Sequence, residues 1–333
     1  MTEPHSETHY SFDCAGQPLA ARLVLITGIT RSGTTLLGNL VGSLKDTEYD
    51  FEPWIFHCVP MMAASGQIQR QAAVEIFRGY FNETLTSFLH GRGVNFRPTD
   101  DTRIWNRIPL DEVFSRWYQL KDRWDVKRYA QDHQSIFSFK VTNFGPFFNL
   151  LWNAFPQLKI IHILRHPLHV ALSIQKKGWF NLDRLQQLEG LPIKKVARNK
   201  DGNFFIPWWV EEEEVESFLK MSDFARALYC WRVIMERTEE QKKRLNLSEV
   251  RHQDRYYEVR YEDLLKDPKS FIEGTAKFMG TNLTGQTQTL LQTVRSERLK
   301  EVADFPLDEI SEEEKRRVAK LLEAIPYELP QFA

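Results

Sequence analysis

One loop near the start of the chain constrains the fold more than any other feature. Residues 22–27 (RLVLIT) are a short apolar run typical of a strand that is buried on both faces. The loop Gly28–Thr35 (GITRSGTT) follows, and leucines then recur at helical spacing from Leu36 to Leu44. In a strand–loop–helix unit, backbone N–H groups and the positive end of the helix dipole converge on the loop. The sequence therefore predicts an anion-binding loop.

This loop differs from the ATP-binding pattern G-x-x-x-x-G-K-[ST] in the position of its cation. Gly28 and Gly33 have the right spacing, but Thr34 stands where that pattern has lysine, and the cation is Arg31. A cation inside the loop can reach the bridging oxygen of a bound anhydride, whereas the lysine contact to the end phosphates is missing. The alternative is a turn without a ligand. It is disfavoured because the strand context, two glycines and three hydroxyl groups coincide here.

The alternation of strand and helix patterns along the chain predicts an α/β fold. Further strands are expected at residues 159–164 (KIIHIL) and 257–261 (YEVRY). Helical patterns follow from Pro167, from about 268 to 279 and, behind a capping box of Ser311 and Glu314, as far as Leu322. This order favours a P-loop-type parallel sheet flanked by helices on both faces.

The chain is expected to form a single domain over residues 1–333. We place its core at about 20–330 and an N-terminal extension at 1–19, because no repeat or low-complexity linker divides the sequence. Residues 178–220 do not fit the sheet pattern and are rich in tryptophan, phenylalanine and glutamate. We expect them to form a helical or irregular excursion that covers a cleft as a lid.

The charge balance and the cysteines exclude several classes of protein. The 44 Lys and Arg residues against 45 Asp and Glu residues leave a net charge of −1, so the chain has no bulk attraction to nucleic acid or to an anionic membrane. Three widely spaced cysteines without a CxxC pattern argue against a disulfide scaffold and a zinc ribbon. With neither a signal peptide nor a membrane span in the pattern, we expect a cytoplasmic protein.

Three segments together resemble the sulfotransferases that use 3′-phosphoadenosine 5′-phosphosulfate (PAPS). They are Arg31–Thr35 (RSGTT), Arg165–Ser173 (RHPLHVALS) and Val259–Leu264 (VRYEDL), and they occur in the order of that family. The resemblance implies PAPS as cofactor and no metal. It assigns the 5′-phosphosulfate to the loop and the 3′-phosphate to the second segment. The implied nucleotide-binding residues are Arg31, Ser32, Gly33, Thr34, Thr35, Arg165, Ser173 and Tyr261.

The chemistry of the second segment agrees with this assignment. Arg165 at the end of a strand offers an always-charged donor fork for a phosphate, and strand ends are where open α/β sheets bind ligands. Ser173 about two turns into the following helix adds a hydroxyl donor if it faces back over the strand ends. The alternatives to phosphate binding are that Arg165 forms a surface ion pair and that Ser173 is a helix residue without a specific role.

Spacing within the family points to catalytic residues. The intervals resemble those of the protein-tyrosine and bacterial sulfotransferases, and the late glycine-rich block of the cytosolic small-molecule branch is not found. The resemblance implies that Glu52 is the base and that Lys140 and Arg31 are catalytic cations. Val141 and Thr142 stand where the family usually has Thr-Pro after this lysine, so the sequence departs from the family pattern there. Aromatic neighbours of Glu52 are expected to desolvate its carboxylate. His57 is the alternative base, because imidazole titrates near neutrality.

The resulting hypothesis is in-line transfer of a sulfuryl group from PAPS to a hydroxyl, or less favourably an amine, of a small-molecule acceptor. By analogy with loose phosphoryl transition states, positioning and cationic contacts can carry such a reaction without a metal. The 42 aromatic residues (23 Phe, 10 Tyr, 9 Trp) favour an apolar or planar-walled acceptor cleft. A natural product, a lipid, a sugar and a tyrosyl peptide all remain open. The rival functions are a kinase with a degenerate loop and an inactive nucleotide-binding module.

Overall fold

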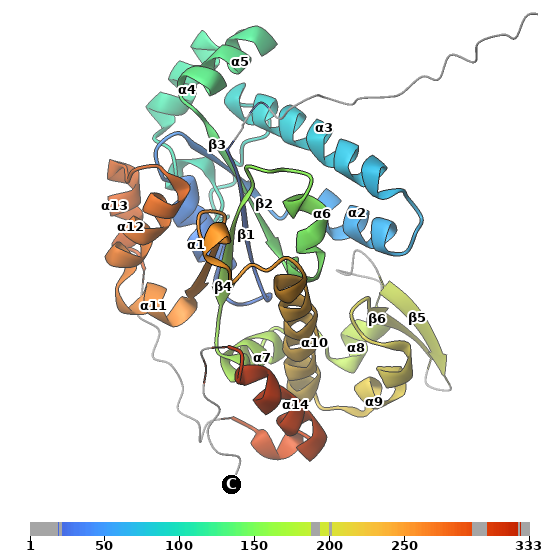
Figure 1. Cartoon of the computed structure of the whole chain (residues 1–333). Helices are drawn as coiled ribbons and strands as arrows, with labels where there is room; N and C mark the ends of the chain where they lie inside the picture. The colour runs from blue at the N-terminus through green and yellow to red at the C-terminus, as the bar shows by residue number, and fades with distance from the viewer. Residues whose placement is uncertain are drawn as a thin grey trace, which may run out of the picture.

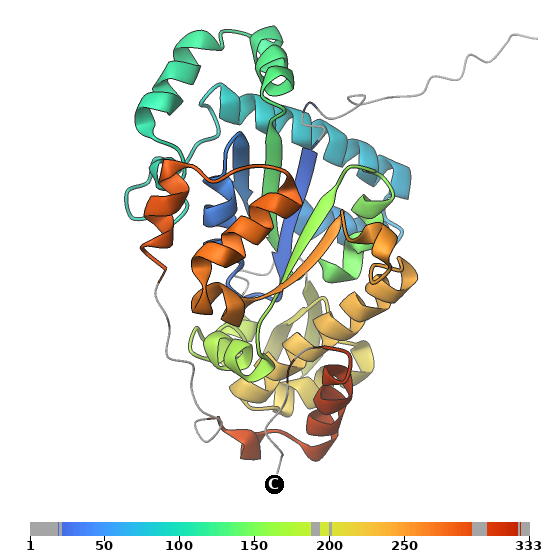
Figure 2. The same ribbon diagram turned by 60° about the vertical axis from the view of Figure 1, so that its left-hand side comes forward.

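The structure is a computed structural model, and it describes Leu19, residues 22–187, 194–199, 202–294 and 305–325, and Tyr327. A twisted central sheet lies between two layers of helices, and a further group of helices packs beyond the end of the sheet (Figures 1 and 2). Within the described residues, no helix combines the length and the apolar character that a membrane span needs.

The central sheet has five strands in the order β2-β3-β1-β4-β7, and every neighbouring pair is parallel. Their bounds are Arg22–Gly28 (β1), Thr47–Phe51 (β2), Ile136–Thr142 (β3), Lys159–Leu164 (β4) and Tyr256–Arg260 (β7). The α/β class and the three predicted strands are confirmed. The last strand ends one residue earlier than predicted, because Tyr261 begins a helix. Since all strands are parallel, their carboxyl ends meet at one edge of the sheet.

Two strands of the central sheet, β2 and β3, were not predicted from the sequence. Both carry polar residues in positions that the sheet buries, so neither resembles a continuous apolar run. In β2, Glu48 forms a buried ion pair with Arg116. In β3, the Ser138 hydroxyl donates to the Glu48 carbonyl oxygen at 2.8 Å, and Lys140 is 2% exposed. These groups are tolerated because partners distant in the sequence satisfy them.

Each face of the sheet is covered by its own set of helices. In β1, Val24 and Ile26 join one apolar cluster while Leu23 and Leu25 join the other, as the alternation of a strand requires. The first cluster includes residues of α1 (Thr34–Gly42), α11 (Tyr261–Lys266) and α12 (Pro268–Met279), and α13 (Gly285–Leu291) packs against it. The second includes residues of α2 (Ile55–Ala64), α3 (Arg70–Leu89), α5 (Arg123–Asp132) and α6 (Phe148–Trp152). Helix α4 (Leu110–Gln119) lies next to α5 (Figure 1).

A third apolar cluster lies beyond the carboxyl ends of the strands. It joins α7 (Pro167–Gln175), the long helix α10 (Asp223–Arg244) and α14 (Glu312–Leu322) to the excursion predicted between β4 and β7. That excursion, residues 178–220, contains α8 (Leu182–Gln186), an antiparallel pair of β5 (Lys194–Asn199) and β6 (Gly202–Pro207), and α9 (Val215–Lys220). The strand pair corrects the expectation of a purely helical or irregular excursion, because the two short strands satisfy each other's backbone groups apart from the central sheet. Short 3-10 helices occur at Ile104–Asn106, Gly145–Phe147, Glu212–Glu214, Val250–His252 and Leu307–Glu309.

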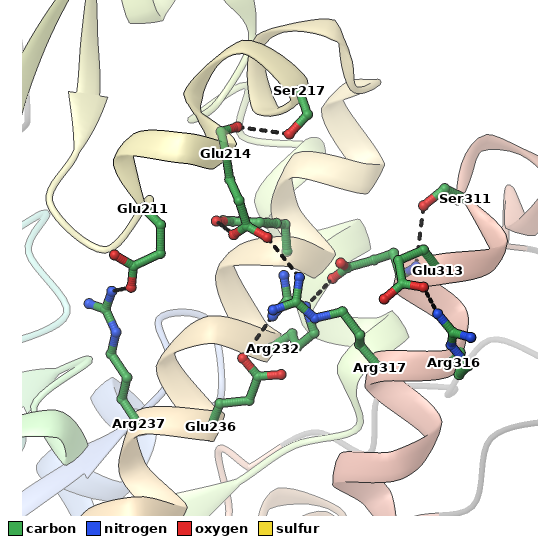
Figure 3. Close-up of polar contacts among 12 residues, drawn as sticks. Glu211, Glu214, Ser217, Arg232, Glu236, Arg237, Ser311, Glu313, Arg316 and Arg317 are labelled. Carbon is green, nitrogen blue, oxygen red and sulfur yellow. Dashed lines mark hydrogen bonds and ion pairs between the residues drawn. The ribbon is translucent and has the colours of Figure 1, made fainter.

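A buried arginine ties this third group together. Arg232 of α10 is fully buried, and its guanidinium pairs with Glu236 at 2.7 Å (Figure 3). It also pairs with Glu314 of α14 at 2.7 Å. Glu314 is therefore not free to complete the predicted capping box. Ser311 accepts the Glu314 N–H at 3.2 Å, which is one half of that motif.

Candidate functional site

The predicted anion-binding loop is the turn between β1 and α1. Arg31 and Gly33 have φ angles of 70° and 88°, so the loop curls through left-handed conformations. The Ser32 N–H donates to the Ile29 carbonyl oxygen at 3.0 Å. The Ser32 side chain is fully buried, and its hydroxyl has no hydrogen-bond partner within the described part of the chain. A buried donor of this kind fits a loop that receives an anion, because an unsatisfied polar group is otherwise costly.

Four of the predicted nucleotide-binding residues meet at this loop. The Arg165 Nη1 donates to the Arg31 carbonyl oxygen at 2.9 Å, and its guanidinium lies 4.4 Å from the centre of the Tyr261 ring. The Arg31 Nε donates to the Ser173 hydroxyl at 3.0 Å. Helix α7 thus does face Ser173 back towards the strand ends, where it contacts the loop arginine. Thr34 and Thr35 occupy the first turn of α1.

A buried lysine and a carboxylate form the centre of the site. The Lys140 Nζ, from β3, lies 2.7 Å from Glu52 Oε1, and the Thr142 hydroxyl donates to the same oxygen at 3.2 Å. The Lys140 Nζ is also 4.0 Å from the centre of the Phe51 ring. Burial lowers the pKa of Lys140, the Glu52 carboxylate opposes this effect, and the Arg31 charge lowers the pKa further. Arg31, Lys140 and Glu52 therefore belong to one electrostatic group.

The surroundings of Glu52 differ from the sequence-based expectation. Its aromatic neighbours Phe51 and Trp54 are 40% and 70% exposed, and they leave the Glu52 side chain 32% exposed. The Lys140 ammonium, and not an apolar wall, dominates its environment. Glu52 also has a φ angle of 47°, and its N–H donates to the Lys140 carbonyl oxygen at 2.9 Å, which holds the residue at the edge of the sheet.

His57 lies in the first turns of α2, close to the same carboxylate. Burial lowers the pKa of His57; the Glu52 charge acts against this and the Lys140 charge adds to it. The lowered pKa leaves its imidazole neutral, and hence able to accept a proton, at neutral pH. Both base candidates identified in the sequence are therefore present in one place.

A cavity of about 640 Å³ opens onto Glu52 and His57. Half of its sixteen lining residues are aromatic: Trp54, Phe56, Phe144, Phe147, Trp179, Phe180, Trp208 and Trp209. The excursion between β4 and β7 contributes the last four of these residues together with Arg184, Leu185 and Pro207. The Trp179 ring lies 5.6 Å from the Arg31 guanidinium, which joins the cavity to the anion-binding loop.

Three residues of the site were not singled out in the sequence. Asn143 accepts the Thr30 N–H at 2.9 Å and has a φ angle of 59°; an asparagine directly after a buried run is a recognisable signal for such a turn. Glu262 accepts the His166 N–H at 3.0 Å and the Tyr327 hydroxyl at 2.6 Å. It thereby holds the start of α7 beside Arg165. Nothing in the local sequence around Tyr327 indicates this contact.

The histidines near Arg165 contact aromatic rings, a hydroxyl group and a carboxylate. The His162 Nδ1 lies 2.8 Å from the Tyr256 hydroxyl and 3.3 Å from the Glu258 carboxylate. The His166 ring packs edge-on against both His169 and Tyr327. In the part of the chain that the structure describes, no group of three His, Cys, Asp or Glu side chains is arranged to hold a metal ion.

Comparison with known proteins gives one family for most of the chain. The family model of the sulfotransferase domain matches residues 22–323. The sulfotransferase domain of the Synechococcus PCC 7002 olefin synthase is 18% identical, with 92% of this chain and 95% of that chain covered and a TM-score of 0.45. The sulfotransferase domain from the curacin biosynthetic pathway is 15% identical, with 92% and 98% covered and a TM-score of 0.48.

A retinol dehydratase in complex with androsterone and the inactive cofactor PAP is also similar. It is 15% identical, with 96% of this chain and 86% of that chain covered and a TM-score of 0.38. Comparison with curated proteins gives no significant match.

Proposed function

We propose a reaction for this chain, which belongs to the sulfotransferase family: transfer of the sulfuryl group of PAPS to a hydroxyl group of an acceptor bound in the aromatic cavity. The resemblance to the PAPS-dependent sulfotransferases is confirmed, the chain is an enzyme that transfers sulfuryl groups, and PAPS is its expected donor. One observation carries the proposed roles of individual residues. Arg31, Lys140 and Glu52, from three separate segments, form one charged group between the anion-binding loop and the cavity.

The residues present fit the donor. PAPS supplies a sulfuryl group that is activated by its anhydride to a phosphate. Ser32, with its buried and unsatisfied hydroxyl, Gly33, Thr34 and Thr35 would hold the 5′-phosphosulfate at the positive end of α1. Arg165 and Ser173 would hold the 3′-phosphate beside Tyr261.

Arg31 and Lys140 would stabilise the negative charge that develops on the leaving oxygen. Both cations lie at the carboxyl edge of the sheet, and Lys140 is 2% exposed, so little water screens its charge. Its contact with Glu52 at 2.7 Å fixes the ammonium before the reaction, which removes a cost of reorganisation.

Glu52 would take the proton of the acceptor hydroxyl. Its carboxylate lies 2.7 Å from the Lys140 ammonium, at the edge of the sheet where the sulfuryl group would be held. Glu52 lines the cavity, so an acceptor bound there can reach its carboxylate. His57 is the second candidate, because it lines the same cavity as a neutral imidazole.

The acceptor is proposed to be a small molecule or natural product, since the cavity has a volume typical of small-molecule sites and largely aromatic walls. The excursion at 178–220 is proposed to act as the lid over this acceptor, because it supplies seven of the lining residues. A cytoplasmic location also remains a proposal. It is compatible with Cys58 and Cys230, which are buried free thiols.

The test combines product detection with ligand choice. The purified chain is incubated with PAPS and a library of hydroxyl-bearing acceptors, and mass spectrometry is used to find products that gain one sulfuryl group. In parallel, the melting temperature is measured with 3′-phosphoadenosine 5′-phosphate (PAP), 5′-AMP and Mg-ATP. We expect PAP to stabilise most. Equal or greater stabilisation by Mg-ATP would support the kinase alternative, which the absence of the lysine at Thr34 disfavours.

A further inference from the structure

We infer that the acceptor carries an anionic group on an apolar, planar body, and that Arg184 is the residue that binds this group. The inference rests on the proposed function, because it names the class of substrate for the same cavity. It follows from the distribution of charge among the lining residues.

The walls of the cavity select for planar apolar molecules. Trp54, Trp179 and Trp208 lie on its boundary, and Trp54 is 70% exposed. A largely exposed tryptophan at a cavity leaves apolar surface in contact with water until a ligand covers it. Aromatic faces on both the α2 side and the excursion side favour a flat ring system between them.

The charged groups of the cavity leave one uncompensated cation. Glu52 is neutralised by Lys140 at 2.7 Å, and the lowered pKa of His57 leaves its imidazole uncharged at neutral pH. Arg184 is the one arginine or lysine among the described lining residues. No ion pair to its guanidinium is present within the described parts of the chain. An acceptor with a carboxylate, sulfate or phosphate group would supply the missing charge, whereas a protonated amine would be repelled.

Arg184 is held in this position by a short, well-anchored helix. The Asn181 side chain accepts the Arg184 N–H at 2.8 Å and caps α8. The next residue, Leu185, is buried in the same apolar cluster as Trp209, and α8 packs against β6. The arginine backbone is therefore fixed relative to the tryptophans, while its side chain remains exposed at the cavity.

Binding can be measured separately from the reaction. Isothermal titration calorimetry is performed in saturating PAP, which allows an acceptor to bind but provides no sulfuryl group. Three probes share one scaffold and differ in charge: 2-naphthol, 6-hydroxy-2-naphthoate and 6-(aminomethyl)-2-naphthol. We expect the naphthoate to bind about 2- to 5-fold more tightly than the naphthol, the range for a charged contact at an exposed arginine, and the amine to bind most weakly.

Two variants test whether Arg184 causes this order. Arg184→Gln should reduce the ratio of naphthoate to naphthol affinity to about one, and Arg184→Glu should make the amine the preferred probe. Arg198→Gln is the matched control, because Arg198 is an exposed arginine of the same excursion that does not line the cavity. It should leave the ratio unchanged.

The outcomes separate this inference from the proposed function. Equal affinities in the unmodified chain, no binding of any probe, or an unchanged order in Arg184→Glu would each overturn the role of Arg184, even if PAPS yields sulfated products. Charge-dependent binding that Arg184→Glu reverses, without sulfated product in PAPS, would support the anion site and contradict the proposed reaction.

Discussion

At the scale of single residues, the identity of the base is the sharpest question. The Glu52 carboxylate pairs with Lys140 at 2.7 Å, and burial lowers the pKa of the neighbouring His57, so both residues are candidates for the base. We predict that Glu52→Gln keeps PAP affinity and lowers kcat by about 10²- to 10⁴-fold, the usual contribution of a general base. Steady-state kinetics with calorimetry of PAP binding provides the measurement. Full activity of Glu52→Gln together with an inactive His57→Ala would instead assign the base to His57.

The proposed role of Lys140 predicts how kcat depends on pH. Burial lowers its pKa, so its positive charge is lost at a lower pH than for an ordinary lysine. Because the proposed role requires the protonated form, we predict that kcat falls as the pH rises through this lowered pKa. In Lys140→Arg the alkaline limb should move to higher pH, since a guanidinium stays charged. Lys140→Met should lower kcat by about 10²-fold or more at every pH.

A pH–rate profile of the three proteins checks this prediction. An alkaline limb that is identical in the unmodified chain and in Lys140→Arg would show that another group controls it. An effect of Lys140→Met on KM alone would assign the lysine to uniform nucleotide binding.

At the scale of elements, the anion-binding loop depends on contact with α11. Gly33 has a φ angle of 88°, and a Cβ atom there would overlap the Tyr261 ring. We predict that Gly33→Ala weakens PAP binding by at least about 10-fold, because a left-handed residue with a side chain costs about 1–2 kcal/mol before the overlap is counted. Calorimetric titration with PAP measures the effect.

Gly79→Ala provides the matched control for that substitution. Gly79 lies inside α3, and a Cβ atom there would meet no other group within 4 Å. This variant should bind PAP normally and gain up to about 1 kcal/mol of stability from the better helix propensity of alanine. If both variants bind PAP like the unmodified chain, the curvature of the loop does not matter for the nucleotide.

At the scale of the whole molecule, a polar cluster joins the sheet to the helices beyond it. Glu258 of β7 receives a hydrogen bond from Lys242 of α10 at 2.6 Å and lies 3.3 Å from His162 of β4. Burial alone would raise the pKa of Glu258, but the hydrogen bonds and charges of His162 and Lys242 together lower it to about 2. The ionised carboxylate therefore stabilises the fold across three elements.

This cluster predicts the acid stability of the protein. A carboxylate with a lowered folded-state pKa contributes its full stability above its ordinary value of 4.5 and loses it as the pH falls towards 2. We predict that Glu258→Gln lowers the free energy of unfolding by about 2–3 kcal/mol at pH 7, and that the difference shrinks below pH 4.5. Denaturant unfolding at several pH values measures it. Glu273→Gln, at an exposed ion pair, should have little effect, and a Glu258→Gln difference independent of pH would contradict the linkage.

Local patterns were sufficient to predict the framework of the proposed donor site. Each signal used for this prediction involves only a few neighbouring residues and can therefore be recognised in the sequence. The signals are the apolar runs of β1 and β4, the glycines of the loop and the proline at the start of α7. They also determine where Arg31, Arg165 and Ser173 lie along the chain. Because parallel strands end at one edge, the convergence of these residues follows from the fold class.

Only the tertiary structure decided how the polar residues are paired. Strands β2 and β3 were not predicted because Glu48, Ser138 and Lys140 are buried there, and their partners lie 68 to 90 residues away in the sequence. The same non-local pairing joins Lys140 to Glu52, in place of the apolar enclosure expected from the neighbours of the glutamate. The position of Arg184 in the aromatic cavity likewise depends on how the excursion packs against α10, which no local pattern specifies.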